Sequence, residues 1–130
     1  MREIKFRGKP EGDDEWVYGS YYKSSNHVIV TNEVMNYKHV VVNPETVGQF
    51  IERKDGNGKE IYEGDVINDG RDDYVIKYCE HSYSNILAFH PISIKYEDAH
   101  IEYYYGEWDS EGTQVVGNKT DNPELMKEST

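Results

Sequence analysis

Turn-forming residues divide this chain into short apolar runs, and this division constrains the fold more than any other feature. The strongest turn signal is Asp55-Gly56-Asn57-Gly58, because Asp-Gly and Asn-Gly pairs supply the positive φ angles of tight hairpin turns. A second glycine-aspartate pair, Gly64-Asp65, stands between the apolar pairs Ile61-Tyr62 and Val66-Ile67 and predicts another sharp turn. The sequence therefore predicts short strands joined by tight turns.

Apolar or alternating runs recur at roughly 8–12-residue spacing, which is typical of a small barrel or sandwich. They lie at residues 4–6, 16–22, 28–30, 39–42, 45–51, 61–62, 66–67, 74–78, 86–89 and 113–116. Near the end, Asn122-Pro123-Glu124 offers an Asn cap, Pro at the first helical position and an acid in the first turn. We expect a mainly β protein with additional hairpins and a short C-terminal helix.

The length of 130 residues fits one domain, and we treat residues 1–130 as a single unit. Two small β modules that share a core are the alternative. Twelve Tyr, three Phe and two Trp argue against a disordered chain, because disordered chains are poor in aromatic residues.

The formal charge of −11 comes from 25 acidic and 14 basic residues that are unevenly spread. Residues 1–10 carry four basic groups and one acid, whereas residues 97–130 carry nine acids and two basic groups. Nucleic-acid binding depends on a concentrated positive surface. The composition therefore argues against general nucleic-acid binding and leaves the N-terminal cluster as its sole candidate.

Cys79 is the only cysteine, so no intrachain disulfide and no Cys-based zinc site can form. No apolar run approaches the length of a membrane span or a signal-peptide core. We expect a location in the cytoplasm and no membrane association.

Three blocks of the sequence resemble the YopX family of phage and prophage proteins. The first is Arg2 to Lys9 followed by Trp16 to Gly19, and the last is Val115 to Asn118 followed by Asn122 to Leu125. The middle block, Val47 to Phe50 with Lys54 to Ile67, is the longest and most specific. Because the blocks lie at the start, middle and end, the resemblance spans essentially the whole chain.

The resemblance implies a largely β protein that contains an SH3-like barrel and acts in a bacterial host cytoplasm. It implies no activity, since no function is established for the family. The chain departs from the family pattern at Ile51-Glu52-Arg53, where relatives carry a Thr-Gly-Leu-like stretch, and residues 70–111 match no family block.

Four carboxylates fall within eleven residues and form the first candidate site: Asp55, Glu60, Glu63 and Asp65. Converging carboxylates could act as acid and base or hold a hard cation. A calcium loop that began at Asp55 would need a glutamate at its twelfth position, where Val66 stands. We favour a structural turn motif formed by Asp55, Gly56, Gly58, Gly64 and Asp65.

The histidines and the cysteine offer weaker signals. His27, His39, His81, His90 and His100 are isolated in sequence and show no metal-type spacing. Cys79 stands two residues from His81, but the neighbouring acid Glu80 raises a thiol pKa, which disfavours a nucleophile. The sequence predicts no metal site, no cofactor and no catalytic residue, and it contains no phosphate loop or dinucleotide fingerprint.

The segment Tyr103 to Asp109 is aromatic and acidic, and it holds our candidate partner-binding residues, Tyr104 and Trp108. Exposed Tyr and Trp are enriched at protein interfaces. The alternative is that these rings belong to the core.

The leading functional hypothesis is a non-catalytic protein-interaction module encoded by a phage or prophage. One alternative is an acidic nucleic-acid mimic that acts on a DNA-handling host protein. Another is a metal-assisted hydrolase that uses the Asp55–Asp65 carboxylates. A basic-patch nucleic-acid binder is a fourth possibility, because SH3-like barrels sometimes serve that role. Short edge strands could also pair between chains, although no sequence feature demands it.

Overall fold

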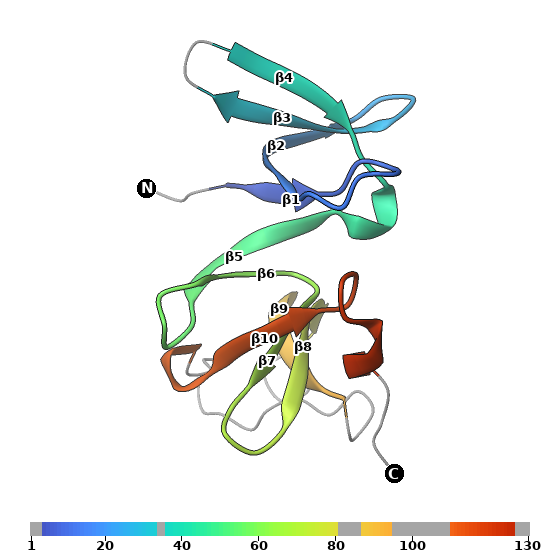
Figure 1. Ribbon diagram of the computed structural model, residues 1–130. Coiled ribbons are helices and arrows are strands. Elements are labelled where there is room, and N and C mark those ends of the chain that lie inside the picture. Colours follow the sequence, from blue (N-terminus) through green and yellow to red (C-terminus); the bar gives the residue numbers. More distant parts are fainter. Residues whose placement is uncertain (1–3, 34–35, 81–86, 95–109, 127–130) are drawn as a thin grey trace. The chain divides into compact units, whose positions relative to one another are not determined.

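The computed structural model describes residues 4–33, 36–80, 87–94 and 110–126 (Figure 1). These residues form ten β-strands and short 3-10 turns, with no α-helix in the described ranges. The chain divides into two compact units, Met1–Phe50 and Ile51–Thr130. The mainly β class predicted from the sequence is confirmed.

The N-terminal unit is an antiparallel sheet with the strand order β4-β3-β2-β1-β5. Its elements are β1 (Phe6–Gly8), β2 (Val17–Lys23), β3 (His27–Glu33), β4 (Asn36–Val41), the 3-10 turn η1 (Pro44–Thr46) and the start of β5 (Gly48–Lys54). Phe6 pairs with Gly19 and Gly8 with Val17, so the runs predicted at residues 4–6 and 16–22 contribute to an antiparallel pair of strands at the N-terminus. Ile29 is fully buried, and burial of one such side chain contributes about 1.5–3 kcal/mol.

The second unit contains an antiparallel sheet with the order β10-β7-β8-β9, and β6 is the neighbour of β5. Its elements are β6 (Glu60–Tyr62), β7 (Asp65–Asn68), β8 (Asp73–Glu80), β9 (Leu87–Ser93), η3 (Ser110–Gly112), β10 (Gln114–Asn118) and η4 (Pro123–Met126). Its core is formed by Ile61, Ile67 and Ile76, against which Tyr74 and Val115 pack.

Two expectations about the architecture differ from the structure. Both sheets are open over the described residues, so closure into an SH3-like barrel is not observed there. The predicted C-terminal helix is wrong for these residues, because Pro123–Met126 forms only a 3-10 turn. The Leu125 N–H donates to the Asn122 carbonyl, three residues back. The Asn122 side chain accepts from the Asn118 N–H of β10 at 3.2 Å, and so holds the turn against the strand.

Gly117 has no side chain, which allows Asn122 and Leu125 of this turn to pack closely against β10. It lies at a register shift between β10 and β7, and a Cβ there would stand 2.5 Å from Asn122 Oδ1 and 2.8 Å from Leu125 Cδ1. We expect Gly117→Ala to lower the free energy of unfolding by about 1–3 kcal/mol, because the turn must shift to admit a methyl group. Urea denaturation measures this loss. The neighbouring exposed residue supplies the control, Val116→Ala, and an equal effect of both substitutions would contradict the packing argument.

Candidate functional site

The predicted partner-binding residues Tyr104 and Trp108 lie outside the described residues. The candidate site residues within the described ranges are the turn aspartates, His27, His39 and the exposed aromatic residues.

Asp55 is buried, with 4% of its surface exposed, and its carboxylate organises the β5–β6 turn. Oδ1 accepts from the N–H groups of Asn57 and Lys59, both at 2.9 Å. Oδ2 accepts from the N–H of Val115 at 2.9 Å, sixty residues along the chain. Both carboxylate oxygens therefore bind backbone, and they join the hairpin turn to β10.

The two glycines of this turn have different roles: Gly56 admits the close approach of residues 110–115, and Gly58 adopts a positive φ. The Gly56 N–H donates to the Thr113 carbonyl at 2.9 Å, and a Cβ on Gly56 would stand 2.7 Å from the carbonyl oxygen of Glu111. Gly58 has a φ of 80°, which an L side chain adopts only with strain. The turn thus fits against residues 110–115 through backbone contacts.

The electrostatics of the turn follow from these hydrogen bonds. Burial raises the pKa of the Asp55 carboxyl, but three N–H donors outweigh it, namely those of Val115, Lys59 and Asn57. The positive charge of Lys59 acts in the same direction. The pKa of Asp55 therefore lies below its ordinary value of 3.8, and the group is ionised at neutral pH.

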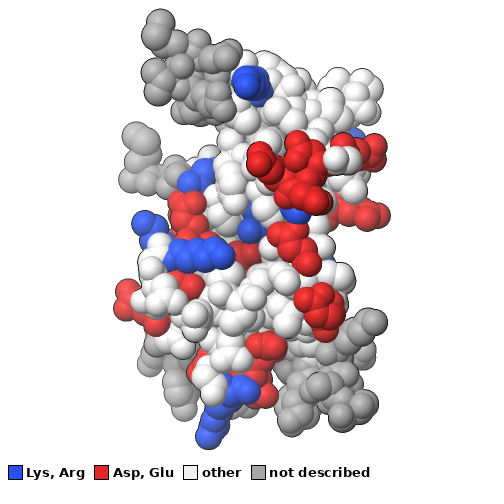
Figure 2. Space-filling view, in the orientation of Figure 1, with Lys and Arg blue, Asp and Glu red and all other residues white. Residues whose placement is uncertain are grey.

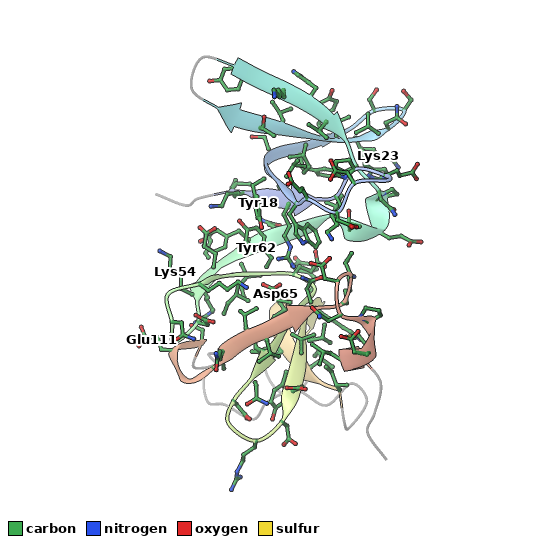
Figure 3. All side chains as sticks on the ribbon, viewed as in Figure 1. Tyr18, Lys23, Lys54, Tyr62, Asp65 and Glu111 are labelled. Carbon is green, nitrogen blue, oxygen red and sulfur yellow. The ribbon has the colours of Figure 1, made fainter. Side chains whose placement is uncertain are left out.

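Asp65 follows the second predicted turn and has 2% of its surface exposed. Its Oδ2 accepts from the N–H of Tyr62 at 2.8 Å; Figure 3 labels both residues, which begin β7 and end β6. Between them, Gly64 has a φ of 92°, donates to the Ile76 carbonyl and accepts from the Lys119 N–H. The Asp65 side chain thereby connects β7 to the end of β6, and the backbone of Gly64 binds both Ile76 of β8 and Lys119 after β10.

A third carboxylate closes the β7–β8 turn in a similar way. Oδ1 of Asp69 accepts from the N–H groups of Arg71 and Asp72, each at 3.0 Å. Burial raises the pKa of Tyr74 to about 12, and the charge of the hydrogen-bonded Asp69 raises it in the same direction.

The remaining titratable candidates do not converge in the part of the chain that is described. Glu60 accepts from the Tyr62 hydroxyl at 3.1 Å. His81 and His100 lie outside the described residues, and for Cys79 only the backbone, in β8, is placed. Within the described ranges, no three His, Cys, Asp or Glu residues are grouped to hold a metal ion.

The basic residues of the N-terminal strand lie against aromatic rings. Arg7 Cζ is 4.4 Å from the centre of the Trp16 ring, and Lys9 Nζ is 5.1 Å from the same centre. Lys5 Nζ is 5.3 Å from the Phe50 ring centre. Such cation–π contacts contribute about 0.5–2 kcal/mol each. Arg7 is also buried, so its side chain takes part in packing within the unit.

One face of the β2–β3–β4 sheet carries exposed tyrosines. The register places Tyr22 opposite Val28 and Val28 opposite Val41, so these three side chains share a face. The exposed fractions are 45% for Tyr18, 42% for Tyr22, 67% for Tyr37 and 54% for Val41. We call this side of the sheet the tyrosine face; it comprises Tyr18, Ser20, Tyr22, Val28, Val30, Tyr37, His39 and Val41. Val28 is the buried member of this set, with 6% of its surface exposed.

Within β2, β3 and β4 the tyrosine face carries no Lys, Arg, Asp or Glu; in the neighbouring strand β1, Arg7 pairs with Tyr18 and so shares this face at its β1 side. Lys23 and Lys38 belong to the opposite face, since they pair with His27 and Thr31. The Tyr22 hydroxyl and His39 Nδ1 are 3.3 Å apart, and the two rings pack edge to face. Figure 3 labels Tyr18 and Lys23, which lie near the two ends of β2.

The two units differ strongly in charge. Residues 1–50 hold six basic and seven acidic groups, a net charge of −1, whereas residues 51–130 hold eight basic and eighteen acidic groups, a net charge of −10. On the face shown in Figure 2, basic side chains are interspersed among the acidic ones. The tyrosine face lies wholly in the nearly neutral unit, residues 1–50.

The sequence contained a partial signal for the tyrosine face. Tyr18, Ser20 and Tyr22 alternate with Gly19 and Tyr21, which is the spacing of one strand face. Tyr37 lies in a largely polar stretch between the apolar runs at residues 28–30 and 39–42, so its own neighbours in sequence do not predict a strand. The local sequence does not determine which strands are neighbours. The tyrosine face is therefore defined by the pairing of β2, β3 and β4.

No helix in the described part of the chain is both long and apolar enough to cross a bilayer. A sequence model of the family described as "YopX protein" matches residues 5–127. No curated protein matches the chain with significant similarity.

Proposed function

The chain belongs to the YopX family, and we propose that it is a non-catalytic protein-interaction module that binds its partner through the tyrosine face. In this proposal the protein is phage- or prophage-encoded and acts in the bacterial host cytoplasm. The SH3-like barrel implied by the family resemblance stays a prediction, because the sheets of the described residues are open.

The observation that carries the proposal is the exposure of aromatic side chains on a sheet face that has no charged residue in β2, β3 or β4. Tyrosine is enriched in interface cores, where charged residues are depleted. When tyrosine is buried in an interface, its ring contributes a large apolar area and its hydroxyl forms a hydrogen bond. Tyr37 and Val41, at 67% and 54% exposure, have apolar surface left to bury against another protein.

The carboxylates support a structural role in preference to catalysis. A general base or metal ligand needs lone pairs that point toward a substrate or an ion. Both oxygens of Asp55 accept backbone N–H groups, and Asp65 accepts from Tyr62. We therefore assign no catalytic residue among them.

The acidic mimic is a second candidate, because the charge of −10 in residues 51–130 is the largest electrostatic feature of the chain. An acidic mimic would bind its target through the carboxylates of the second unit and not through the tyrosine face. The two candidates thus predict opposite responses to substitution of the tyrosines.

Affinity capture from nuclease-treated bacterial lysate tests the proposal. We expect Tyr22→Ser with Tyr37→Ser to lower partner recovery at least about tenfold, because each interface tyrosine contributes about 1 kcal/mol or more. Mass spectrometry quantifies the recovery, and thermal unfolding verifies that the variant is folded. The matched control is Tyr78→Ser, at a 53% exposed tyrosine of β8.

Unchanged recovery by the double variant would contradict the proposal. If the retained partner handles DNA and is lost when acids of the second unit are replaced by glutamine, the acidic mimic takes its place.

A further inference from the structure

Strand β4 (Asn36–Val41) is the edge strand of the N-terminal sheet (Figure 1). Among the described residues, β3 is the one strand that pairs with it. An edge strand offers a row of backbone N–H and C=O groups on which another strand can be added.

The hydrogen bonds show which groups of β4 point outward. The Val42 N–H donates to the His27 carbonyl at 2.9 Å, so residue 42 points its backbone toward β3. Bonding alternates along an antiparallel ladder, so Val40 and Lys38 also point toward β3. The backbone groups of Tyr37, His39 and Val41 therefore point to the outer edge.

The β2–β3 ladder gives the same alternation independently. The Ser24 N–H donates to the Asn26 carbonyl, so β3 bonds to β2 through Val28 and Val30. Consequently His27, Ile29 and Thr31 face β4, as the Val42 bond requires.

We propose that a second copy of this chain adds its own β4 to this edge, antiparallel and about a twofold axis at His39. In this register each Tyr37 lies opposite Val41 of the other copy, and His39 lies opposite His39. These three positions are the ones whose backbone groups point outward, so every outward residue enters a hydrogen-bonded pair.

Two further features favour pairing of β4 with β4 of a second copy. An isologous contact requires a self-complementary strand, and the register pairs an aromatic with a β-branched residue twice, which is a favourable cross-strand combination. Lys38 falls opposite Val40, so the two lysines do not oppose each other. The unit that carries β4 has a net charge of −1, so it adds little repulsion to the contact.

The dimer joins two tyrosine faces into one continuous sheet surface, because residues 37, 39 and 41 place their side chains on that face. Its existence does not depend on the proposed partner, and it is tested with the purified chain alone.

Cysteine cross-linking tests the register in a Cys79→Ser background. Opposed residues of a hydrogen-bonded pair have Cα atoms about 5.5 Å apart, within disulfide range. We expect His39→Cys to give a disulfide-linked dimer under mild oxidation. Lys38→Cys is the matched control, because two residues of offset separate its Cα atoms by more than about 7 Å. Equal cross-linking of both variants, or none with His39→Cys, would overturn the register.

Sedimentation equilibrium tests the association itself. We expect the wild-type chain to dimerise reversibly, and His39→Pro to raise the dissociation constant at least about tenfold by removing an outward N–H. His39→Thr keeps that N–H and should keep the dimer, while circular dichroism verifies the fold of both variants. A wild-type monomer at every concentration, or a dimer unaffected by proline, would overturn the proposal. If the wild-type monomer captures a partner and His39→Pro loses it, a strand of that protein occupies the edge.

Discussion

Replacing Asp55 by alanine is expected to lower the free energy of unfolding of the second unit by about 3 kcal/mol. The substitution removes the acceptor for three N–H groups, those of Asn57, Lys59 and Val115. A buried donor left without an acceptor costs about 1–3 kcal/mol, and partial hydration of the turn lowers the sum. Urea denaturation measures the total. Amide hydrogen exchange at Val115 measures the loss of the link to β10.

Two variants show whether the carboxylate is responsible. Asp55→Asn keeps one acceptor oxygen, so it should lose less stability than Asp55→Ala. Glu124→Ala removes an exposed carboxylate from the same unit and should change stability by no more than about 0.5 kcal/mol. If Asp55→Ala is no more destabilising than Glu124→Ala, the turn does not depend on this carboxylate.

Lowering the pH should reduce the contribution of the Asp55 carboxylate to the free energy of unfolding. The pKa of Asp55 is lower in the folded chain than its ordinary value of 3.8, so the unfolded chain binds more protons at acid pH. The stabilisation is complete above this ordinary pKa, which the unfolded chain has, and is lost as the pH falls through the lower folded pKa. The stability difference between the wild type and Asp55→Asn should therefore narrow below about pH 4. Asp69, whose pKa is also lowered, titrates in both proteins and cancels in this difference.

The turn chemistry of the sequence predicted the Asp55 site in part. Asp-Gly and Asn-Gly pairs mark a turn locally, and the bonds from Asn57 and Lys59 lie within it. The bond from Val115 could not be predicted, because it depends on a contact across sixty residues. The C-terminal error has a local cause, four residues away in the chain. Asn122 resembles a helix cap in sequence, but its side chain is bound to Asn118 of the preceding strand.

Strand positions were predicted more reliably than strand lengths. The run Val28-Ile29-Val30 lies inside β3, and Tyr74 to Tyr78 lies inside β8. The start of β4 was not predicted, because Asn36 and Tyr37 are held in the strand by pairing with β3, not by their own apolar pattern. Pairing satisfies backbone groups whatever side chains they carry. In β3 and β8 the apolar run therefore lies within the strand, whereas pairing with the neighbouring strand determines where β4 begins.

Gly19→Ala is expected to be the most damaging substitution in the N-terminal unit, with a loss of about 3 kcal/mol or more. A Cβ at residue 19 would stand 2.0 Å from the carbonyl oxygen of Val30 and 3.1 Å from the Cα of Thr31. The obstacle is the backbone of β3, so no change of side-chain rotamer can relieve it. Strands β2 and β3 would have to separate, and the tyrosine face is built on both.

Fluorescence of Trp16 in a Trp108→Phe background reports unfolding of this unit, since Trp16 packs against Arg7. The glycine control is Gly12→Ala: Gly12 has a φ of 78° but no atom within 4 Å of an added Cβ, so only about 1–2 kcal/mol of backbone strain is expected. A loss at Gly19 no larger than at Gly12 would mean that β2 and β3 can move apart without cost. The pairing that aligns Tyr22, Val28 and Val41 would then be too weak to hold the tyrosine face together.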